Sequence, residues 1–386
     1  MKIIVDAEDV PNARTGIPRV TFLDIQVFSM LFAEVRLLVS KKNRNRFITS
    51  EENELLKSRF LNTEKCKIEL SSHRPTNKSL WIWQQVGGYG FKDDIEFDFR
   101  YSSNFPYMYR SSKKTIDLIR LHDTFQKSEQ ISLKSAGMNQ GKNVLARDLR
   151  NVAFKRALGK NPLLVANSFK TRSEFFDEYD LDSNQIHVIH PSVGFRSQHK
   201  FVENPLKVER PYIVSVMSQR QRKRPIFVIN AWAKVATKLN LDFVQIGKIP
   251  LGDLNPDAAK HLSNQRLRVF ESLTSNQLRE LQRNAIASVF ASSGEGFGMP
   301  IAESLFMGVP VMHNDLEVFA EVSGEIGLKF SLLKEETFIE TLHTLTSDEF
   351  HYSKLREKSW QRGLFFSHEF SATKWRDILI KNDFEG

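Results

Sequence analysis

Two glutamates, Glu295 and Glu303, stand eight positions apart in the stretch GEGFGMPIAESLFMGVPV, which begins at residue 294. The glycines between them allow a tight turn with accessible backbone amides. Pro300 suits the start of a helix, where its missing N–H would have no partner. A loop that runs into a helix start offers N–H groups and the positive end of the helix dipole to an anion. Carboxylates near a helix start also favour the dipole without doing chemistry, so the spacing alone leaves both interpretations open.

This stretch predicts a loop, a helix over residues 301–307 that ends at Gly308, and a buried strand over residues 309–312. The rest of the chain repeats the pattern of short apolar runs followed by periodic segments. The predicted strands cover residues 2–6, 35–40, 80–86, 115–121, 163–166, 186–189, 212–217, 241–246, 268–270 and 286–291. The predicted helices cover residues 20–32, 168–179, 226–238, 275–282, 335–346, 349–366 and 371–381. Such alternation is typical of parallel sheets covered on both faces.

The chain has 386 residues, a formal net charge of +9 and one cysteine, Cys66. This length suits two domains, and a single cysteine excludes an intrachain disulfide framework and suits a reducing compartment. No secretory leader is evident at the start, and no apolar run reaches 18 residues, so we expect a cytoplasmic protein. A basic charge is compatible with nucleic acid, but no interleaved aromatic and basic motif supports that partner.

The stretch from residue 294 to 311 resembles the E-x7-E signature of retaining glycosyltransferases with the GT-B fold, in glycosyltransferase family 4 (glycosyl transferases group 1). The resemblance implies an α/β protein with two Rossmann-like, doubly wound domains that face a cleft. The implied domains are residues 1–203 for the acceptor, residues 204–366 for the nucleotide-sugar donor, and a C-terminal helix over residues 367–386 that crosses back to the first domain.

In that family the first glutamate contacts the donor sugar and the second holds the ribose hydroxyls of the nucleotide. The resemblance therefore implies these roles for Glu295 and Glu303. It also implies that the intervening loop contacts the donor, through Gly296, Phe297, Gly298 and Met299.

The segment QRQRKRP, which starts at residue 219, matches the family segment that supplies an arginine and a lysine to the donor diphosphate. Lys223 lies just before the predicted helix and is the best match. The family often has a glycine early in this loop and this chain has none, so either Arg220 or Arg222 could be the partner. Val269 and Glu271 fall where the family contacts the nucleotide base.

The first domain has two further matches to the family. Gly16 and Arg19 follow the first predicted strand, where the family has a Gly-x-x-Arg pattern near the donor phosphates or the acceptor. His122 and Asp123 end the strand over residues 115–121, and the family places a histidine there beside the donor sugar and acceptor. The catalytic candidates are therefore Glu295, His122 and Lys223, and the acceptor-side candidates are Arg19, His122 and Asp123.

The resemblance implies transfer of a hexose from a nucleotide-diphosphate sugar to a glycan or polyprenyl-linked saccharide, in synthesis of lipopolysaccharide O-antigen, capsule or a similar surface polysaccharide. Mannose is the first donor sugar to consider, and UDP- or dTDP-hexoses come next. We expect no metal or other cofactor, because the basic loop and the helix-start amides can meet the diphosphate charge. The one Asp-x-Asp triplet, at residues 180–182, follows a predicted helix of the first domain and is interpreted as a turn.

Two basic segments, residues 41–46 and a predicted helix over residues 143–158, are either solvated faces or peripheral contacts with an anionic membrane. An epimerase-like or phosphorylase activity, or a non-catalytic nucleotide-sugar-binding protein, would use the same fold.

Overall fold

The computed structural model describes residues 1–7, 10, 16–40, 66–71, 97–103, 115–122, 152, 154–194, 210–218 and 222–381. The chain forms two units, Met1–Ser192 with His368–Gly386 and Val193–Ser367. The sequence-based boundaries fell after residues 203 and 366, against 192 and 367 in the structure. The chain enters and leaves the second unit at neighbouring points, because Val193 N–H donates to the Phe366 carbonyl (2.8 Å) and Gly194 bridges to Ser367.

The first unit is built on a seven-stranded parallel sheet in the order β3-β2-β1-β4-β5-β6-β7. Its strands are β1 (Lys2–Asp6), β2 (Glu34–Ser40), β3 (Cys66–Ser71), β4 (Phe99–Ser102), β5 (Ile116–Leu121), β6 (Leu163–Ala166) and β7 (Ile186–Val188). Strand β1 pairs with both β2 and β4, with Ile3 opposite Val35 and Phe99. The order therefore reverses beside β1, which is the doubly wound arrangement that the sequence predicted.

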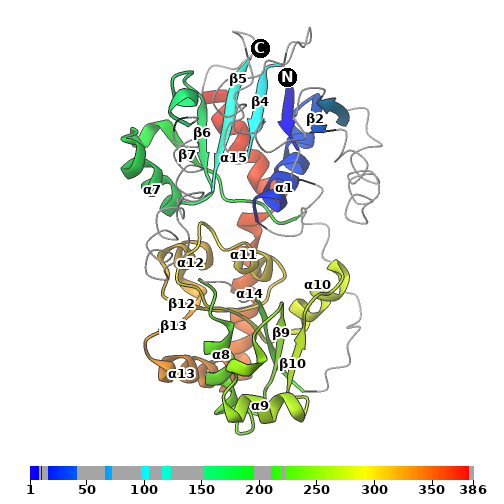
Figure 1. The fold of residues 1–386 in the computed structure, drawn as a ribbon, viewed down its shortest axis with the longest axis vertical. Coiled ribbons are helices and arrows are strands. Elements are labelled where there is room, and N and C mark those ends of the chain that lie inside the picture. The colour runs from blue at the N-terminus through cyan, green and yellow to red at the C-terminus, as the bar shows by residue number, and fades with distance from the viewer. Residues whose placement is uncertain are drawn as a thin grey trace. The chain divides into compact units, whose positions relative to one another are not determined.

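Helix α1 (Gly16–Leu31) and the C-terminal helix α15 (His368–Lys381) pack against each other in this unit (Figure 1). Trp375 of α15 is fully buried, and its ring lies edge-on to Phe28 of α1 (5.1 Å between centroids) and to Tyr101 of β4 (6.2 Å). The last helix of the chain thus completes the core of the first unit. Helix α7 (Phe169–Tyr179) and the 3-10 turn η3 (Ser183–Gln185) follow β6.

The second unit contains a six-stranded parallel sheet in the order β10-β9-β8-β11-β12-β13. Its strands are β8 (Tyr212–Val216), β9 (Asp242–Ile246), β10 (Leu267–Phe270), β11 (Ala287–Phe290), β12 (Val311–Asn314) and β13 (Leu328–Phe330). This is the strand order of the dinucleotide-binding Rossmann fold, and it reverses between β8 and β11.

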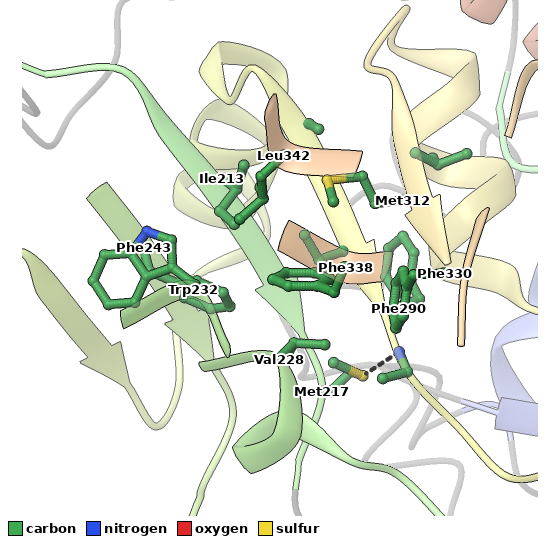
Figure 2. Packing of buried hydrophobic residues seen from close by; sticks show 14 of the residues in the cluster. Ile213, Met217, Val228, Trp232, Phe243, Phe290, Met312, Phe330, Phe338 and Leu342 are labelled. Atoms are coloured by element: carbon green, nitrogen blue, oxygen red, sulfur yellow. Dashed lines mark hydrogen bonds between the residues drawn. The ribbon is translucent and has the colours of Figure 1, made fainter. Parts of the chain in front are cut away.

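The helices of the second unit are α8 (Pro225–Ala233), α9 (Pro256–Ser263), α10 (Ser275–Asn284), α11 (Met299–Phe306), α12 (Glu317–Ser323), α13 (Glu335–Thr346) and α14 (Glu349–Gly363). Short 3-10 turns complete it: η5 (Leu251–Asp253), η6 (Gly324–Ile326) and η7 (Leu364–Phe366). Trp232 of α8 packs on Phe243 of β9, and Phe338 of α13 packs edge-on against Phe330 of β13 (Figure 2). These contacts fix the helices on the sheet.

Most predicted elements are present within one or two residues of their expected ends. The bounds of β1, β6 and α13 are as predicted, and Ser168 caps α7 by accepting from the Thr171 N–H (2.9 Å). Three strands were not predicted, namely β3, β4 and β13. β13 and β4 have only three and four residues, too few for a periodicity to show. Of the predicted basic helix over residues 143–158, only 152 and 154–158 lie within the described residues, and these are helical, whereas the predicted strand over residues 80–86 lies outside them.

Replacement of Trp375 by alanine should destabilise the first unit by about 3–5 kcal/mol, the usual cost of removing a buried large aromatic side chain. Ile380 lies on the same helix and is 50% exposed, so its replacement by alanine should cost less than about 1 kcal/mol. Urea unfolding followed by circular dichroism measures both. Equal losses for the two variants would show that α15 does not complete this core.

Candidate functional site

The loop after β8 and the loop after β11 lie on the two sides of the strand-order reversal in the second unit. In open parallel sheets, ligands bind outside the carboxyl ends of the strands at such a reversal. A short antiparallel ladder joins the two loops here. Arg224 N–H donates to the Ala291 carbonyl (3.0 Å), Ser293 N–H donates to the Arg222 carbonyl (2.8 Å), and Lys223 bridges to Ser292. The basic loop and the glutamate loop therefore form one surface.

A small hollow opens at this ladder. Its lining comes from the ends of β8 and β11, the two loops, the start of α11 and one residue of α12: Met217, Lys223, Phe290, Ala291, Ser292, Glu295, Gly298, Pro300, Ile301 and Phe319. Lys223 and Glu295, both of which the family resemblance had selected, thus line the same hollow. Arg222 adds a second cation, with its guanidinium 4.0 Å from the Glu295 carboxylate. Arg220 lies outside the described residues.

Helix α11 starts near its predicted position, but Pro300 is its second residue and not its first. Gly298 is the N-cap, and Met299 is the first helical residue. Gly298 has φ = +105°, and an added Cβ would lie 3.2 Å from the Phe319 ring, so this position needs glycine. The Met299 N–H has no acceptor within the helix because it belongs to the first turn. Glu303 lies four residues further along the same helix.

The glutamate loop is held by an amide that the sequence analysis missed. Asn314, at the end of β12, accepts from the Ser292 N–H (2.9 Å) and donates to the Ser292 carbonyl (3.0 Å). Both groups are buried. The side chain of Asn314 thereby continues the hydrogen bonding of β12 past Phe290, the last paired residue of β11, to Ser292, and fixes where the loop to Glu295 begins. Polar Asn314, two residues after the apolar run 309–312, was the available signal.

Behind the hollow, backbone and sulfur contacts fix the end of β8. Ala291 N–H donates to the Met217 sulfur (3.3 Å; Figure 2), and the Gln245 amide donates to the Met217 carbonyl (2.6 Å). Val269 and Glu271, the candidates for contact with a base, lie at the end of β10, which pairs with β9. Val269 is half-buried and Glu271 is exposed.

In the first unit, the strand-order reversal lies between β1 and β4, and His122 follows β5 beside it. The His122 ring Nε2 lies 3.2 Å from the Ser103 hydroxyl, and its carbonyl accepts from Asn167 Nδ2 (2.8 Å) and Thr171 Oγ1 (3.0 Å). Burial lowers the pKa of His122 to about 3, and the neighbouring Arg120 acts in the same direction. His122 is therefore a neutral imidazole. Asp123 lies outside the described residues.

Gly16 and Arg19 lie at the start of α1 in the same unit. Gly16 is the first residue of the helix and has φ = +68°, a backbone conformation that suits glycine. The Arg19 guanidinium lies 5.7 Å from the Phe22 ring centroid and is half-buried. The structure thus places the candidates in two sets. Gly16, Arg19 and His122 lie in the first unit, and the loops of Lys223 and Glu295 lie in the second with helix α11, which carries Glu303.

Sequence reasoning also missed a buried polar layer under α1. Asp24 accepts a hydrogen bond from the Tyr101 hydroxyl and lies 3.7 Å from Arg120 Nε, with all three side chains buried. The His368 ring lies between two polar side chains. Its Nε2 is 2.7 Å from Gln26 Oε1, and its Nδ1 is 2.9 Å from the Ser192 hydroxyl. Asp24 and Gln26 interrupt the apolar pattern of residues 20–32, which was the signal for this layer.

No group of three or more His, Cys, Asp and Glu side chains with metal-binding geometry occurs among the described residues. The Asp-x-Asp triplet serves as a turn, as predicted. Asp180 ends α7 in the left-handed conformation (φ = 52°), and the Asp182 side chain caps η3 by accepting from the Asn184 N–H (2.9 Å). In the described part of the chain, no helix has the length and hydropathy needed to cross a bilayer.

The two sheets, their order and the position of the hollow define a GT-B fold, and solved structures support this across the whole chain. HepE from Anabaena, crystallised with UDP and glucose, superposes with a TM-score of 0.64 at 14% identity over 99% of this chain and 100% of that one. WaaG, a glycosyltransferase involved in lipopolysaccharide biosynthesis, gives a TM-score of 0.58 at 15% identity over 98% and 99% of the two chains. The predicted fold class of two Rossmann-like domains is confirmed.

Residues 210–348 match the family model of glycosyl transferases group 1, the family that the E-x7-E stretch resembles. A segment of 68 residues is 37% identical to the serotype-specific mannosyltransferase WbdA of Escherichia coli. That segment covers 18% of this chain and 8% of the relative.

Replacement of Asn314 by alanine should destabilise the second unit by about 2–3 kcal/mol, because it leaves a buried N–H and a buried carbonyl of Ser292 without partners. Asn284 also donates to a backbone carbonyl, that of Glu280 (2.9 Å), but at an exposed position. Its replacement by alanine is the matched control and should cost less than about 1 kcal/mol. Chemical denaturation measures both. Faster amide hydrogen exchange over residues 292–298 in the Asn314 variant alone should accompany the loss, and unchanged exchange would refute this role.

The first unit should lose stability in acid through its buried histidines. Burial lowers the pKa of His368 to about 3, and Arg19 acts in the same direction. The unfolded chain binds a proton on each histidine near pH 6.5 and the folded chain does not, so each contributes a loss of up to about 1.4 kcal/mol per pH unit as the pH falls from about 6.5 toward 3. The melting temperature against pH measures this loss. The His368→Gln variant should show a shallower slope, and an identical slope would mean that His368 is not held neutral.

Proposed function

We propose that this protein is a retaining glycosyltransferase that moves a hexose from a nucleotide-diphosphate sugar to a hydroxyl of a glycan or lipid-linked saccharide. The observation that carries this proposal is the ladder between residues 222–224 and 291–293. It brings the basic loop and the E-x7-E loop to one hollow, at the strand-order reversal of a group 1 domain. A diphosphate next to a sugar needs this combination of cations and carboxylates.

The donor diphosphate would meet Lys223, one of the two arginines, and the first N–H groups of α11. Arg222 is the arginine that the described residues favour, because it lies beside Glu295. Fixed cations and helix-start amides stabilise the charge that develops on a departing phosphate, so a divalent metal is not required for this step. Arg220 remains a second candidate for the same role.

The remaining donor groups would be held along α11 and at the end of β10. Glu295 would accept hydrogen bonds from hydroxyls of the sugar, and Glu303 would accept two from the ribose. The loop residues Gly296, Phe297, Gly298 and Met299 would approach the donor closely, which the glycines permit. Val269 and Glu271 would contact the base. Gly16 would approach the donor phosphates, and Arg19, His122 and Asp123 would serve the acceptor and the sugar.

In the reaction, an acceptor oxygen forms a bond to C1 of the sugar while the bond from C1 to the β-phosphate oxygen breaks. The electron pair of that bond leaves with the nucleoside diphosphate, and the acceptor proton passes to the departing phosphate. Attack on the face that the phosphate leaves retains the configuration at C1. Lys223 would neutralise the leaving group, and Glu295 would stabilise the positive charge that builds up on the sugar ring.

Mannose is the hexose we propose first, on the strength of the segment shared with the Escherichia coli mannosyltransferase. The complex of HepE with UDP and glucose makes a UDP-hexose the second candidate. We propose synthesis of a surface polysaccharide at the inner face of the membrane, on a polyprenyl-linked acceptor. The likeness to WaaG, a glycosyltransferase involved in lipopolysaccharide biosynthesis, and the basic charge of +9 support this setting. The same charge would favour peripheral contact with anionic lipid.

A thermal-shift panel of UDP, GDP, ADP, CMP and dTDP, each with and without magnesium, tests the donor site. One nucleoside diphosphate should raise the midpoint without magnesium, because a ligand that binds only the folded state stabilises it by about 2.7 kcal/mol at one hundred times its dissociation constant. No response to any of the five would contradict the proposal. Release of sugar from the matching donor in the absence of any acceptor would indicate an epimerase-like or phosphorylase activity instead.

Two variants separate the roles of the donor residues. Glu303→Ala should weaken binding of the nucleoside and of its diphosphate alike, by about 1.5–3 kcal/mol, through lost hydrogen bonds to the ribose. Lys223→Ala should weaken binding of the diphosphate far more than that of the nucleoside. Calorimetric titration measures both. Lys238 is exposed in the segment that leads from α8 into the amino end of β9, whereas the hollow lies at the carboxyl ends of the strands. Lys238→Ala should therefore leave both affinities unchanged. Equal losses of nucleoside and diphosphate binding in Lys223→Ala would show that Lys223 does not touch phosphate.

A further inference from the structure

A line of hydroxyl groups connects His122 to the first turn of α1. Ser103 directly follows β4, and His122 directly follows β5, its parallel neighbour in the sheet. The Ser103 hydroxyl lies 3.2 Å from His122 Nε2 and is in hydrogen-bond contact with the Thr21 hydroxyl of α1. The Thr21 hydroxyl lies 3.1 Å from the Ile17 carbonyl oxygen, one turn earlier in the helix. Thr21 and Ser103 are both buried.

The last acceptor in this line fixes the direction of every hydrogen. A carbonyl oxygen can only accept, so the single hydroxyl hydrogen of Thr21 goes to Ile17. The Thr21 oxygen then accepts from Ser103, whose own hydrogen is thereby used. What Ser103 offers to His122 is a lone pair, so the ring must donate through Nε2–H. A neutral imidazole carries one ring hydrogen, which leaves Nδ1 with its lone pair.

Burial and a charge in the same layer keep the ring from taking a second hydrogen. The guanidinium of Arg120, two residues before His122, is buried and stays close to Asp24 (3.7 Å). The Asp24 carboxylate is shared between Arg120 and the Tyr101 hydroxyl, from which it accepts a hydrogen bond, so it neutralises the guanidinium only in part. Burial of the ring is the main cause that lowers the pKa of His122 to about 3, and the buried guanidinium of Arg120 acts in the same direction, whereas a hydrogen bond with the Ser103 backbone acts in the opposite one.

We propose that Ser103 and Thr21 are positioning residues that hold His122 in the Nε2–H tautomer and present its Nδ1 lone pair to a hydroxyl group of the sugar substrate. The sugar hydroxyl rests on the glycosyl transfer proposed above, whereas the tautomer does not. A histidine held this way accepts a hydrogen bond from the ligand and cannot donate one through Nδ1. It therefore selects a hydroxyl at that point over a carboxylate or a carbonyl, neither of which has a hydrogen to give.

Nitrogen-15 spectra of the whole protein, labelled on histidine, test the tautomer directly, because a ring nitrogen that carries hydrogen and one that does not resonate far apart. The chain supplies a reference for each form. His261 Nε2 faces the Ala233 carbonyl (3.2 Å), which requires Nε2–H, and His313 Nδ1 faces the Asn314 carbonyl (2.8 Å), which requires Nδ1–H. The His122→Asn variant assigns the His122 signals. We expect His122 to match His261, and a match to His313 would overturn the proposal without any variant being needed.

Two substitutions test the relay. In Thr21→Val the Ser103 hydrogen is released and can turn to His122 Nε2, so the ratio of Nε2–H to Nδ1–H should fall about tenfold, the factor expected for one hydrogen bond. Thr21→Ser restores the hydroxyl and should restore the ratio. Thr373 of α15 also bonds the carbonyl one turn earlier, that of Glu369 (3.2 Å), but is exposed, so Thr373→Val is the matched control. An unchanged ratio in Thr21→Val would show that the relay does not set the tautomer.

Kinetics separate this proposal from the proposed function. Once the nucleotide panel has identified the donor, Thr21→Val should lower kcat for hexose transfer several-fold while nucleoside diphosphate affinity stays at the wild-type value. If the spectra show Nε2–H and no sugar is transferred from any donor, the positioning stands and the transferase function falls. If transfer occurs and His122 carries Nδ1–H, the positioning falls and the transferase function stands.

Discussion

The reversal of strand order between β8 and β11 is the constraint on which the candidate donor site depends. Strands on either side of a reversal send their helices to opposite faces of the sheet, so a crevice opens at their carboxyl ends. Two loops leave the sheet there, and a ladder of backbone hydrogen bonds joins them through Arg224 and Ser293. Without that ladder, no backbone hydrogen bond would hold the loop of Lys223 beside the loop of Glu295. Because backbone groups form it, the arrangement depends on the path of the chain and little on the side chains that it positions.

The first unit has a buried ion pair, Asp24 and Arg120, inside its core. Asp24, Arg120 and Tyr101 are buried together. Removing the two charged groups from water costs several kcal/mol for each ion, which their mutual attraction must offset. A network of this kind tolerates few arrangements, because a buried polar group without a partner is costly. The same constraint applies to the hydroxyl line from Thr21 to His122, because each of its buried groups depends on the next for a hydrogen-bond partner. The C-terminal helix closes the same core through Trp375, so the end of the chain stabilises the unit that its beginning builds.

Local patterns predicted most of the fold and the glutamate loop. Apolar runs bounded by helix caps located the strands, and the glycines and proline around Glu295 and Glu303 specified a helix start, which the structure shows at Met299 with Gly298 as its cap. The pairing of Lys223 with the Glu295 hollow could be expected only by resemblance to a family, because the two residues are 72 positions apart in the chain. Asn314 and Ser103 were not predicted at all, since each is a single polar residue where a strand ends, and such residues are usual in turns.

The sequence by itself therefore determined most of the element types and their order, and the residues that the glutamate and basic loops carry, because helix caps, glycine turns and hydrophobic periodicity act over a few residues. The tertiary structure alone decided which strand ends meet, which amide holds Ser292, and which hydroxyl groups lie between His122 and helix α1. These depend on contacts between residues far apart in the chain, such as Thr21 with Ser103. The direction of a hydrogen-bond line is set by its last acceptor, and the identity of that acceptor follows from how the sheet and helix are packed.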